Sequence, residues 1–201
     1  MSSSKRRALH SLDSMNVGDN NNSQQSAESL LSEELLELCC KSESLSEEGL
    51  HEIIERHDLT PKNHDVGDYE FFLRACYNKR VNEGIIQCLL EYFPDAASTT
   101  DQGGGSPLHY ACCNKNMTVN IIQLLVDAAP DSVRSVTDCD RTPLHYLCSN
   151  TLDEAAALEI LELLIMKCPE AIRHANNNGD LPIHCAGGSG GRSPEFCSVL
   201  C

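Results

Sequence analysis

The sequence has few aromatic residues, few basic residues and no long apolar run. It contains no tryptophan, and aromatic residues make up 4% of its 201 residues, so aliphatic side chains must form most of any core. Fifteen Lys and Arg oppose thirty Asp and Glu, for a net charge of −15. Such a chain is poorly suited to phosphate backbones, which require clustered basic side chains, and we predict no nucleic-acid partner. Partners with a basic surface are favoured instead.

No apolar run is long enough to cross a membrane. The most hydrophobic stretch, residues 155–166, is interrupted by Glu159 and Glu162. Lys5, Arg6 and Arg7 are followed by no hydrophobic segment, which argues against a secretory signal. The sequence therefore predicts an intracellular protein, cytoplasmic or nuclear, without a membrane span.

Twelve cysteines raise the question of disulfides or zinc, yet the sequence has no Cys-x-x-Cys pair. Cys76, Cys112 and Cys148 lie 36 residues apart, which indicates three copies of one small buried position. In a reducing compartment these thiols stay free. A cysteine-based redox or metal-binding protein is the less favoured alternative.

Residues 1–43 form an acidic tail rich in Ser and Asn, and residues 1–27 are predicted to be disordered. A short helix is predicted over 28–38, because Leu31, Leu35 and Leu38 share one face. Two interpretations of this helix stay open. It is either a transient helix in a tail or an amphipathic segment that docks on a partner or on the chain itself.

Residues 44–64 are predicted to be a degenerate N-terminal half repeat. Ser44 and Glu47 have the spacing of a capping box that starts a helix. Within this helix, Ile53 and Ile54 precede a similar apolar pair, Leu89 and Leu90, by 36 residues. This helix therefore corresponds to the second helix of a repeating unit.

One tetrapeptide occurs three times in the second half of the chain. His109, His145 and His184 end the copies and lie 36 and 39 residues apart. Each copy predicts a helix start, with proline at the first helical position and a histidine that reaches back to the cap. The first two copies have a hydroxyl residue at the N-cap, whereas the imperfect third copy has Leu181 there, which leaves Asp180 as the alternative cap. We assign these residues a structural role: Ser106, Pro107, Leu108, His109, Thr142, Pro143, Leu144, His145, Pro182 and His184.

Three successive units each have a second, more apolar helix, and these helices end before Pro94, Pro130 and Pro169. The 39-residue spacing requires three extra residues, either between the paired helices of the third unit or within its second helix. Thr151 and Glu154 predict a capping box for that helix. The first helices are expected to end in left-handed residues, at Asn78, Asn114 and Asn150.

The repeated Ser/Thr-Pro-Leu-His-Tyr resembles the Thr-Pro-Leu-His-x-Ala signature of ankyrin repeats, and residues 65–201 carry the resemblance. It implies an all-α helical repeat solenoid with short β-hairpin-like loops, made of about three full units and a truncated last one. Asp140 occupies the family's glycine position and is expected to adopt its left-handed conformation. The last helix is expected to lack its final turn and fray, or the chain is a fragment of a longer array.

Catalytic and metal-binding patterns are weak in this sequence. The three motif histidines lie in successive units, about 8–10 Å apart if the helices pack, whereas zinc requires ligands at about 2.0–2.3 Å. There is no nucleophile elbow, and the glycine run at 187–191 lacks the Lys-Ser/Thr of a phosphate loop, which favours a flexible connector. We predict no enzymatic activity, no cofactor and no metal.

The resemblance implies a protein-interaction module or scaffold whose partner contacts the concave face and the hairpin tips. The alternative is a regulatory ankyrin fragment of a longer enzyme or channel. Tyr110 and Tyr146 are the sharpest candidates for partner contact, and the open alternative is that each covers only the neighbouring repeat. By their position in the family, the partner-binding candidates are Arg74, Tyr77, Tyr110, Cys113, Tyr146 and Ser149 on first helices, and Gln102, Asp138 and Asn177 near hairpin tips.

Overall fold

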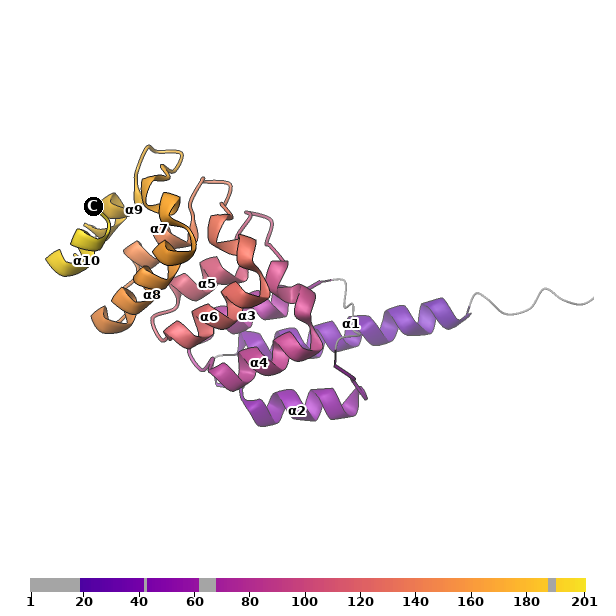
Figure 1. The fold of residues 1–201 in the computed structure, drawn as a ribbon. Coiled ribbons are helices and arrows are strands. Elements are labelled where there is room, and N and C mark those ends of the chain that lie inside the picture. The colour runs from indigo at the N-terminus through magenta and orange to yellow at the C-terminus, as the bar shows by residue number, and fades with distance from the viewer. Residues whose placement is uncertain (1–18, 42, 62–67, 188–190) are drawn as a thin grey trace, which may run out of the picture.

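The computed structural model describes residues 19–41, 43–61, 68–187 and 191–201, with side chains of the first helix described from residue 29. The described residues form two stacked rows of helices and no strand, as an all-α repeat solenoid requires (Figure 1). The first row consists of α1 (Asp19–Cys40), α3 (Glu70–Tyr77), α5 (Pro107–Cys113), α7 (Pro143–Ser149) and α9 (Pro182–Ala186). The second row consists of α2 (Glu47–Arg56), α4 (Glu83–Tyr92), α6 (Val119–Ala128), α8 (Glu154–Lys167) and α10 (Pro194–Val199).

Short 3-10 turns follow three helices of the second row and begin at the recurring prolines. They are η1 (Pro94–Ser98), η2 (Pro130–Arg134) and η3 (Pro169–Arg173). From each turn the chain runs into a hairpin loop, and the loop tips project from the same side of the stack (Figure 1). Successive tips are joined by backbone hydrogen bonds, from Asp138 N–H to the Gly103 carbonyl (2.8 Å) and from Asn177 N–H to the Cys139 carbonyl (3.1 Å).

The hairpin turns use the left-handed conformations that the sequence predicted. Gly104 and Gly179 have φ of 76° and 81°, and Asp140 takes the equivalent place with φ of 60°. A Cβ at Gly104 would meet the Val136 carbonyl oxygen of the next loop at 3.0 Å, so glycine also serves the close approach of neighbouring tips. Aspartate is tolerated at residue 140 because its short side chain suits this backbone region.

The N-terminal helix differs from the prediction. Helix α1 begins earlier, at Asp19, and ends later, at Cys40, than the predicted 28–38 helix. Of the expected disordered segment, residues 1–18 lie outside the described residues. Leu31, Leu35 and Cys39 are buried against α3, so of the two open interpretations the described contacts match docking on the chain itself (Figure 1). Helix α1 thereby takes the place of a first helix beside α2.

Two predicted helix caps are wrong. Helix α2 is capped by Ser46, whose Oγ accepts the Gly49 N–H at 3.0 Å, and Ser44 lies in the preceding turn. Helix α8 is capped by Asp153 rather than Thr151. In both cases the N-cap is the residue directly before the first helical residue, because only its side chain reaches the free N–H groups of the first turn.

The extra residues of the third unit lengthen its second helix. Helix α8 has 14 residues, whereas α4 and α6 have 10 each. Helix α10 has six residues and is shorter than the other second-row helices that follow α3, α5 and α7, in line with the expected missing turn. The glycine-rich connector falls partly on residues 188–190, which lie outside the described residues.

The repeated histidines join each unit to the next. The Nδ1 atom of His109 accepts the Ser106 backbone N–H at 3.1 Å, and its Nε2 lies 3.0 Å from the Arg141 carbonyl oxygen. His145 repeats this pattern with Thr142 and the Asp180 carbonyl. A neutral imidazole protonated on Nε2 satisfies both contacts.

The third copy of the motif keeps only part of this cap. Leu181 has no hydroxyl, yet its N–H still bonds to Nδ1 of His184, so the backbone part of the cap persists and Asp180 does not replace it.

The asparagines at the ends of the first helices were expected to be left-handed, and this prediction is wrong. Asn78, Asn114 and Asn150 have φ between −68° and −85° with an extended ψ. Their side chains instead donate to carbonyls of the preceding first helix: Asn114 Nδ2 lies 3.1 Å from the Cys76 oxygen and 2.9 Å from the Asn78 oxygen. Helices α5 and α7 are thus tied to neighbouring units at both ends.

Burial of His109 makes stability depend on pH. Burial lowers the pKa of His109 to about 4, against the bond to the Arg141 carbonyl, which acts to raise it. The unfolded chain takes up a proton near pH 6.5, so this stabilisation is complete above pH 6.5 and is lost as the pH falls towards 4. We expect this residue to account for a loss of about 2 kcal/mol between pH 7 and pH 5.

Urea unfolding of the wild type and of His109→Ala at both pH values tests this expectation. The variant should be less stable by about 1 kcal/mol or more at pH 7, because a cap is lost, and the gap should shrink at pH 5. A gap of equal size at both pH values contradicts a buried neutral imidazole.

The asparagine contacts predict a second stability effect. Asn114→Ala leaves the Cys76 and Asn78 carbonyls without this donor and should lower the free energy of unfolding by about 1–3 kcal/mol. Asn116→Ala is the matched control, because its exposed side chain bonds only to the Lys79 carbonyl and its loss should stay within about 0.5 kcal/mol. Equal losses in the two variants would show that the buried contacts do not hold the units together.

Candidate partner-binding groove

Two adjoining hollows lie where the first-row helices meet the hairpin loops. The tyrosine hollow, with a volume of about 380 Å³, has walls from α3, α5 and α7 and from the hairpin that precedes α7. The acidic hollow, about 390 Å³, lies beside α3 and the hairpin that precedes α5. Both hollows are lined by Asp101, Gly103 and Tyr110, so together they form one groove.

Three tyrosines from successive first helices line the tyrosine hollow. Tyr110 and Tyr146 occupy the same position in their units, whereas Tyr77 lies one helical turn further along its helix. The Tyr77 and Tyr110 rings meet edge to face, with centroids 6.3 Å apart. Tyr146 packs edge to face on the buried His109 at 5.4 Å. The stacking of the units thus places a short row of aromatic rings along the groove.

Asp101 ties this row to the hairpin. Its Oδ2 accepts the Tyr110 hydroxyl at 2.6 Å, and its Oδ1 accepts the N–H groups of Gly103 and Gly105 at 2.7 Å each. Burial acts to raise the pKa of Asp101, but the bonds from Tyr110 and the two glycines outweigh it and the pKa is lowered. The same hydrogen bond, helped by burial, raises the pKa of Tyr110 to about 12. Tyr110 is therefore a neutral donor held in one orientation.

The acidic hollow contains more carboxylates than cations. Asp68, Glu70 and Asp101 line it together with Arg74, and Arg74 Nε pairs with Glu70 at 3.1 Å. That hydrogen bond raises the pKa of Arg74. The groove is consequently negative at its α3 end and aromatic at its α5–α7 end.

The groove brings together most of the predicted partner-binding residues. Tyr77, Tyr110, Cys113, Asp138 and Tyr146 line the tyrosine hollow, and Arg74 and Gln102 line the acidic hollow. Ser149 is elsewhere, in a hollow beside α8 and α9, and its hydroxyl donates to the His145 carbonyl.

Asn177 lies on the next hairpin tip. Its side chain donates a hydrogen bond to the Asp138 carbonyl at 2.9 Å and so joins the two neighbouring tips. Sequence reasoning did not single out the carboxylate of Asp101 or Cys139 as groove residues. The bond of Asp101 to Tyr110, nine residues later, has no signature in the local sequence.

The groove offers little for nucleophilic or metal chemistry. Burial raises the pKa of Cys113 to about 11, so its thiol is protonated at neutral pH. His109 is 2% exposed and has both ring nitrogens engaged. Within the described ranges, no group of three or more His, Cys, Asp or Glu side chains is placed to hold a metal ion. What remains is a contact surface.

Comparison with models of protein families identifies repeats in this chain. A family model described as "Ankyrin repeats (3 copies)" matches residues 72–166, a range that includes every first-row helix lining the tyrosine hollow except the start of α3. A search of the curated proteins finds no significant match. In the part of the chain that the structure describes, no helix combines the length and apolarity needed to cross a membrane.

The Tyr110–Asp101 bond generates a testable expectation. Tyr110→Phe removes the hydroxyl and should lower the free energy of unfolding by about 1 kcal/mol, because a half-buried bond to a carboxylate is lost. Tyr77→Phe is the control, since no hydrogen bond of the Tyr77 hydroxyl is found among the described residues and 57% of the residue is exposed. Urea unfolding measures both, and equal stabilities would show that the bond does not hold the hairpin.

Proposed function

Because residues 72–166 of this chain are ankyrin repeats, which generally act as protein-interaction modules, we propose that it binds a protein partner through the tyrosine and acidic hollows. In this role the chain acts as a non-catalytic module or scaffold. The partner lies along the concave side, against the first-row helices and the hairpin tips. The buried residues of the repeated motif maintain the stack, and the residues that line the groove select the partner.

The exposed aromatic surface is the observation that carries this proposal. Tyr77 is 57% exposed, the most exposed of the large aromatic residues, and lies edge-on against Tyr110. A tyrosine needed only to cover the neighbouring repeat would be buried by it. Tyrosine contributes contact area at low entropic cost and is enriched at protein interfaces, so an exposed tyrosine beside a half-buried one in a hollow favours partner contact over packing alone.

The charge of the groove supports a partner with a basic surface. The chain carries a net charge of −15, and three carboxylates line the acidic hollow against one arginine. A positive partner surface is attracted to this groove during encounter, and the attraction weakens as salt is added. Nucleic acid is disfavoured for the same reason.

The thiols support an intracellular setting. All twelve cysteines are free, and burial raises the pKa of Cys76, Cys112 and Cys148, the last to about 12. Free buried cysteine is typical of proteins that work in a reducing compartment. We therefore propose a cytoplasmic or nuclear location.

A comparative capture experiment tests the proposed face. Wild-type chain and the double variant Tyr77→Ala/Tyr146→Ala are immobilised, and bound proteins are quantified by mass spectrometry at two salt concentrations. We expect specific partners to be reduced about tenfold or more with the double variant, since loss of two interface aromatics costs several kcal/mol. Their capture by the wild type should also fall with salt.

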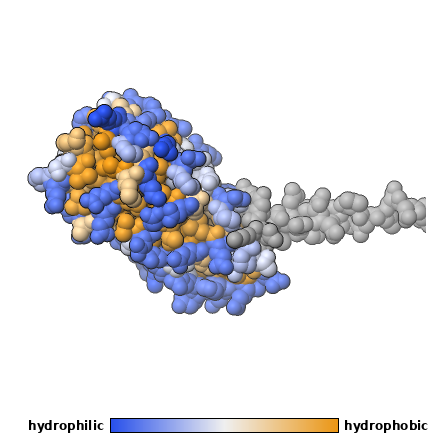
Figure 2. Space-filling model, viewed as in Figure 1, coloured by the Kyte–Doolittle hydropathy of each residue, from blue (hydrophilic) through white to orange (hydrophobic). Residues whose placement is uncertain are grey.

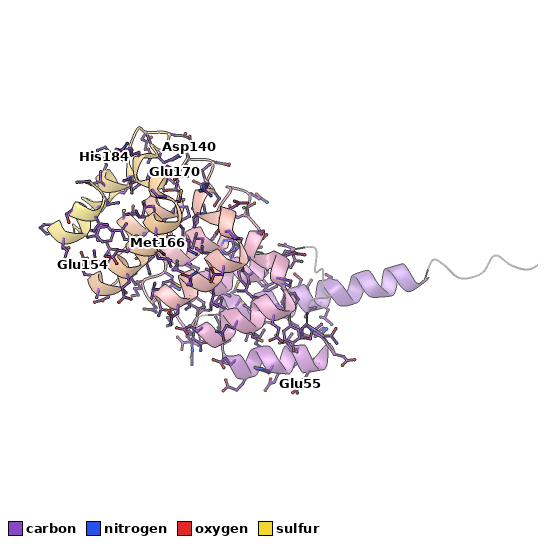
Figure 3. All side chains as sticks on the ribbon, in the orientation of Figure 1. Glu55, Asp140, Glu154, Met166, Glu170 and His184 are labelled. Carbon is purple, nitrogen blue, oxygen red and sulfur yellow. The ribbon has the colours of Figure 1, made fainter. Side chains whose placement is uncertain are left out.

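Met166→Ala provides the matched surface control. Met166 is 69% exposed on α8, in the second row and away from the hairpin loop that carries Asp140 (Figure 3). Unfolding curves establish that all variants are folded. Identical partner lists for wild type and the tyrosine variant, or loss of partners with Met166→Ala alone, would remove the groove assignment.

A further inference from the structure

Asp138 lines the tyrosine hollow, is exposed, and has no hydrogen bond or ion pair of its carboxylate among the described residues. Its backbone is engaged at both ends, since its N–H donates to the Gly103 carbonyl and its own carbonyl accepts from Asn177. The backbone is therefore fixed while the side chain is exposed and free. Asp101, the other carboxylate that lines the hollow, differs because three hydrogen bonds already occupy it.

The rest of the tyrosine hollow is aromatic and carries no cation. No Lys or Arg is among its lining residues, which include Tyr77, Tyr110, Tyr146 and Cys113. The guanidinium of Arg141, which is not a lining residue, lies over the Tyr146 ring at 6.0 Å from its centroid, so this ring already accepts a cation. The hollow thus combines aromatic faces with one unpaired negative charge.

We propose that the tyrosine hollow receives an arginine side chain from a basic segment of the partner protein. The proposal rests on the proposed function and specifies the chemistry of the partner. The guanidinium lies against the exposed tyrosine rings and pairs with the Asp138 carboxylate, while the aliphatic stem packs against Tyr110 and Cys113. Arginine suits this site because its planar, weakly hydrated head group stacks on aromatic rings and forms two parallel hydrogen bonds to a carboxylate.

Other occupants fit the hollow less well. A leucine or phenylalanine would cover the tyrosines but would withdraw Asp138 from water without giving it a partner, which is unfavourable. An acidic side chain would meet Asp138 and Asp101 with the same charge. Lysine satisfies the charge but cannot stack or bond in two places, so it should bind more weakly than arginine.

Matched peptides test the inference on the whole 201-residue chain. Four nine-residue peptides share the same Gly/Ser flanks and differ only at the central residue, which is arginine, lysine, citrulline or leucine. Binding is followed by NMR chemical shifts of the isotopically labelled protein at low salt. Citrulline keeps the shape of arginine and loses its charge, so the comparison isolates the electrostatic contribution.

We expect the arginine peptide to bind about fivefold or more tightly than the citrulline and leucine peptides, with the largest shifts at Tyr77, Tyr110 and Tyr146. Asp138→Asn should reduce the affinity for the arginine peptide towards that of the citrulline peptide. Asp131→Asn removes the same charge on η2, outside the hollow, and should leave the affinity unchanged. Raising the salt concentration should weaken only the charged peptides.

Equal affinity of the arginine and citrulline peptides, tighter binding of the leucine peptide, or equal effects of Asp138→Asn and Asp131→Asn would overturn the inference. Absence of shifts at the three tyrosines with every peptide would do the same. This failure is distinguishable from failure of the proposed function. If partner capture still depends on Tyr77 and Tyr146 while the peptides show no preference for arginine, only the arginine assignment is wrong.

Discussion

The contact on which this fold depends is the buried imidazole that joins one repeat to the next. His109 and His145 each accept the backbone N–H of their own helix cap and contact a carbonyl of the following unit. A single side chain thereby starts a helix and fixes its distance from the next hairpin. At the other end of the first-row helices, Asn114 and Asn150 donate to carbonyls of the preceding unit. Units too small to bury their own apolar faces are held in one register by these contacts.

The register of the stack explains why the groove exists. Helices tied at both ends present equivalent positions in a row, and Tyr110 and Tyr146 occupy one such position. Asp101 then links this row to the hairpin loops through the Tyr110 hydroxyl. The opposite side of the stack, over α4, α6 and α8, shows apolar residues interspersed among hydrophilic ones (Figure 2). The aromatic hollow belongs to the first-row side, where residues that vary between units come together.

Much of the fold could be predicted because the information is local and repeated. The Pro-Leu-His copies, the prolines after the second helices and the left-handed Asp140 all follow from the nearby sequence. The length and role of helix α1 were not predicted correctly because nothing in its sequence resembles the repeat signature. Only its packing against α3 identifies it as a first helix. The predicted left-handed conformation of the asparagines was wrong because the carbonyls that accept their side-chain hydrogen bonds lie 36 to 39 residues away in the sequence. The tyrosines of the groove and Asp138 followed from their position in the family, whereas Asp68, Glu70 and Asp101 were identified as groove residues only in the three-dimensional structure.

In the proposed function, the buried motif residues build the stack and the groove residues bind the partner. An NMR shift map of the labelled chain with a captured partner bound is the sharpest test of this division. The largest shifts should fall on Tyr77, Tyr110 and Tyr146 and on the hairpin tips near Asp101 and Asp138, all on the groove side. Shifts confined to the second-row helices α4, α6 and α8, with the tyrosines unaffected, would contradict it.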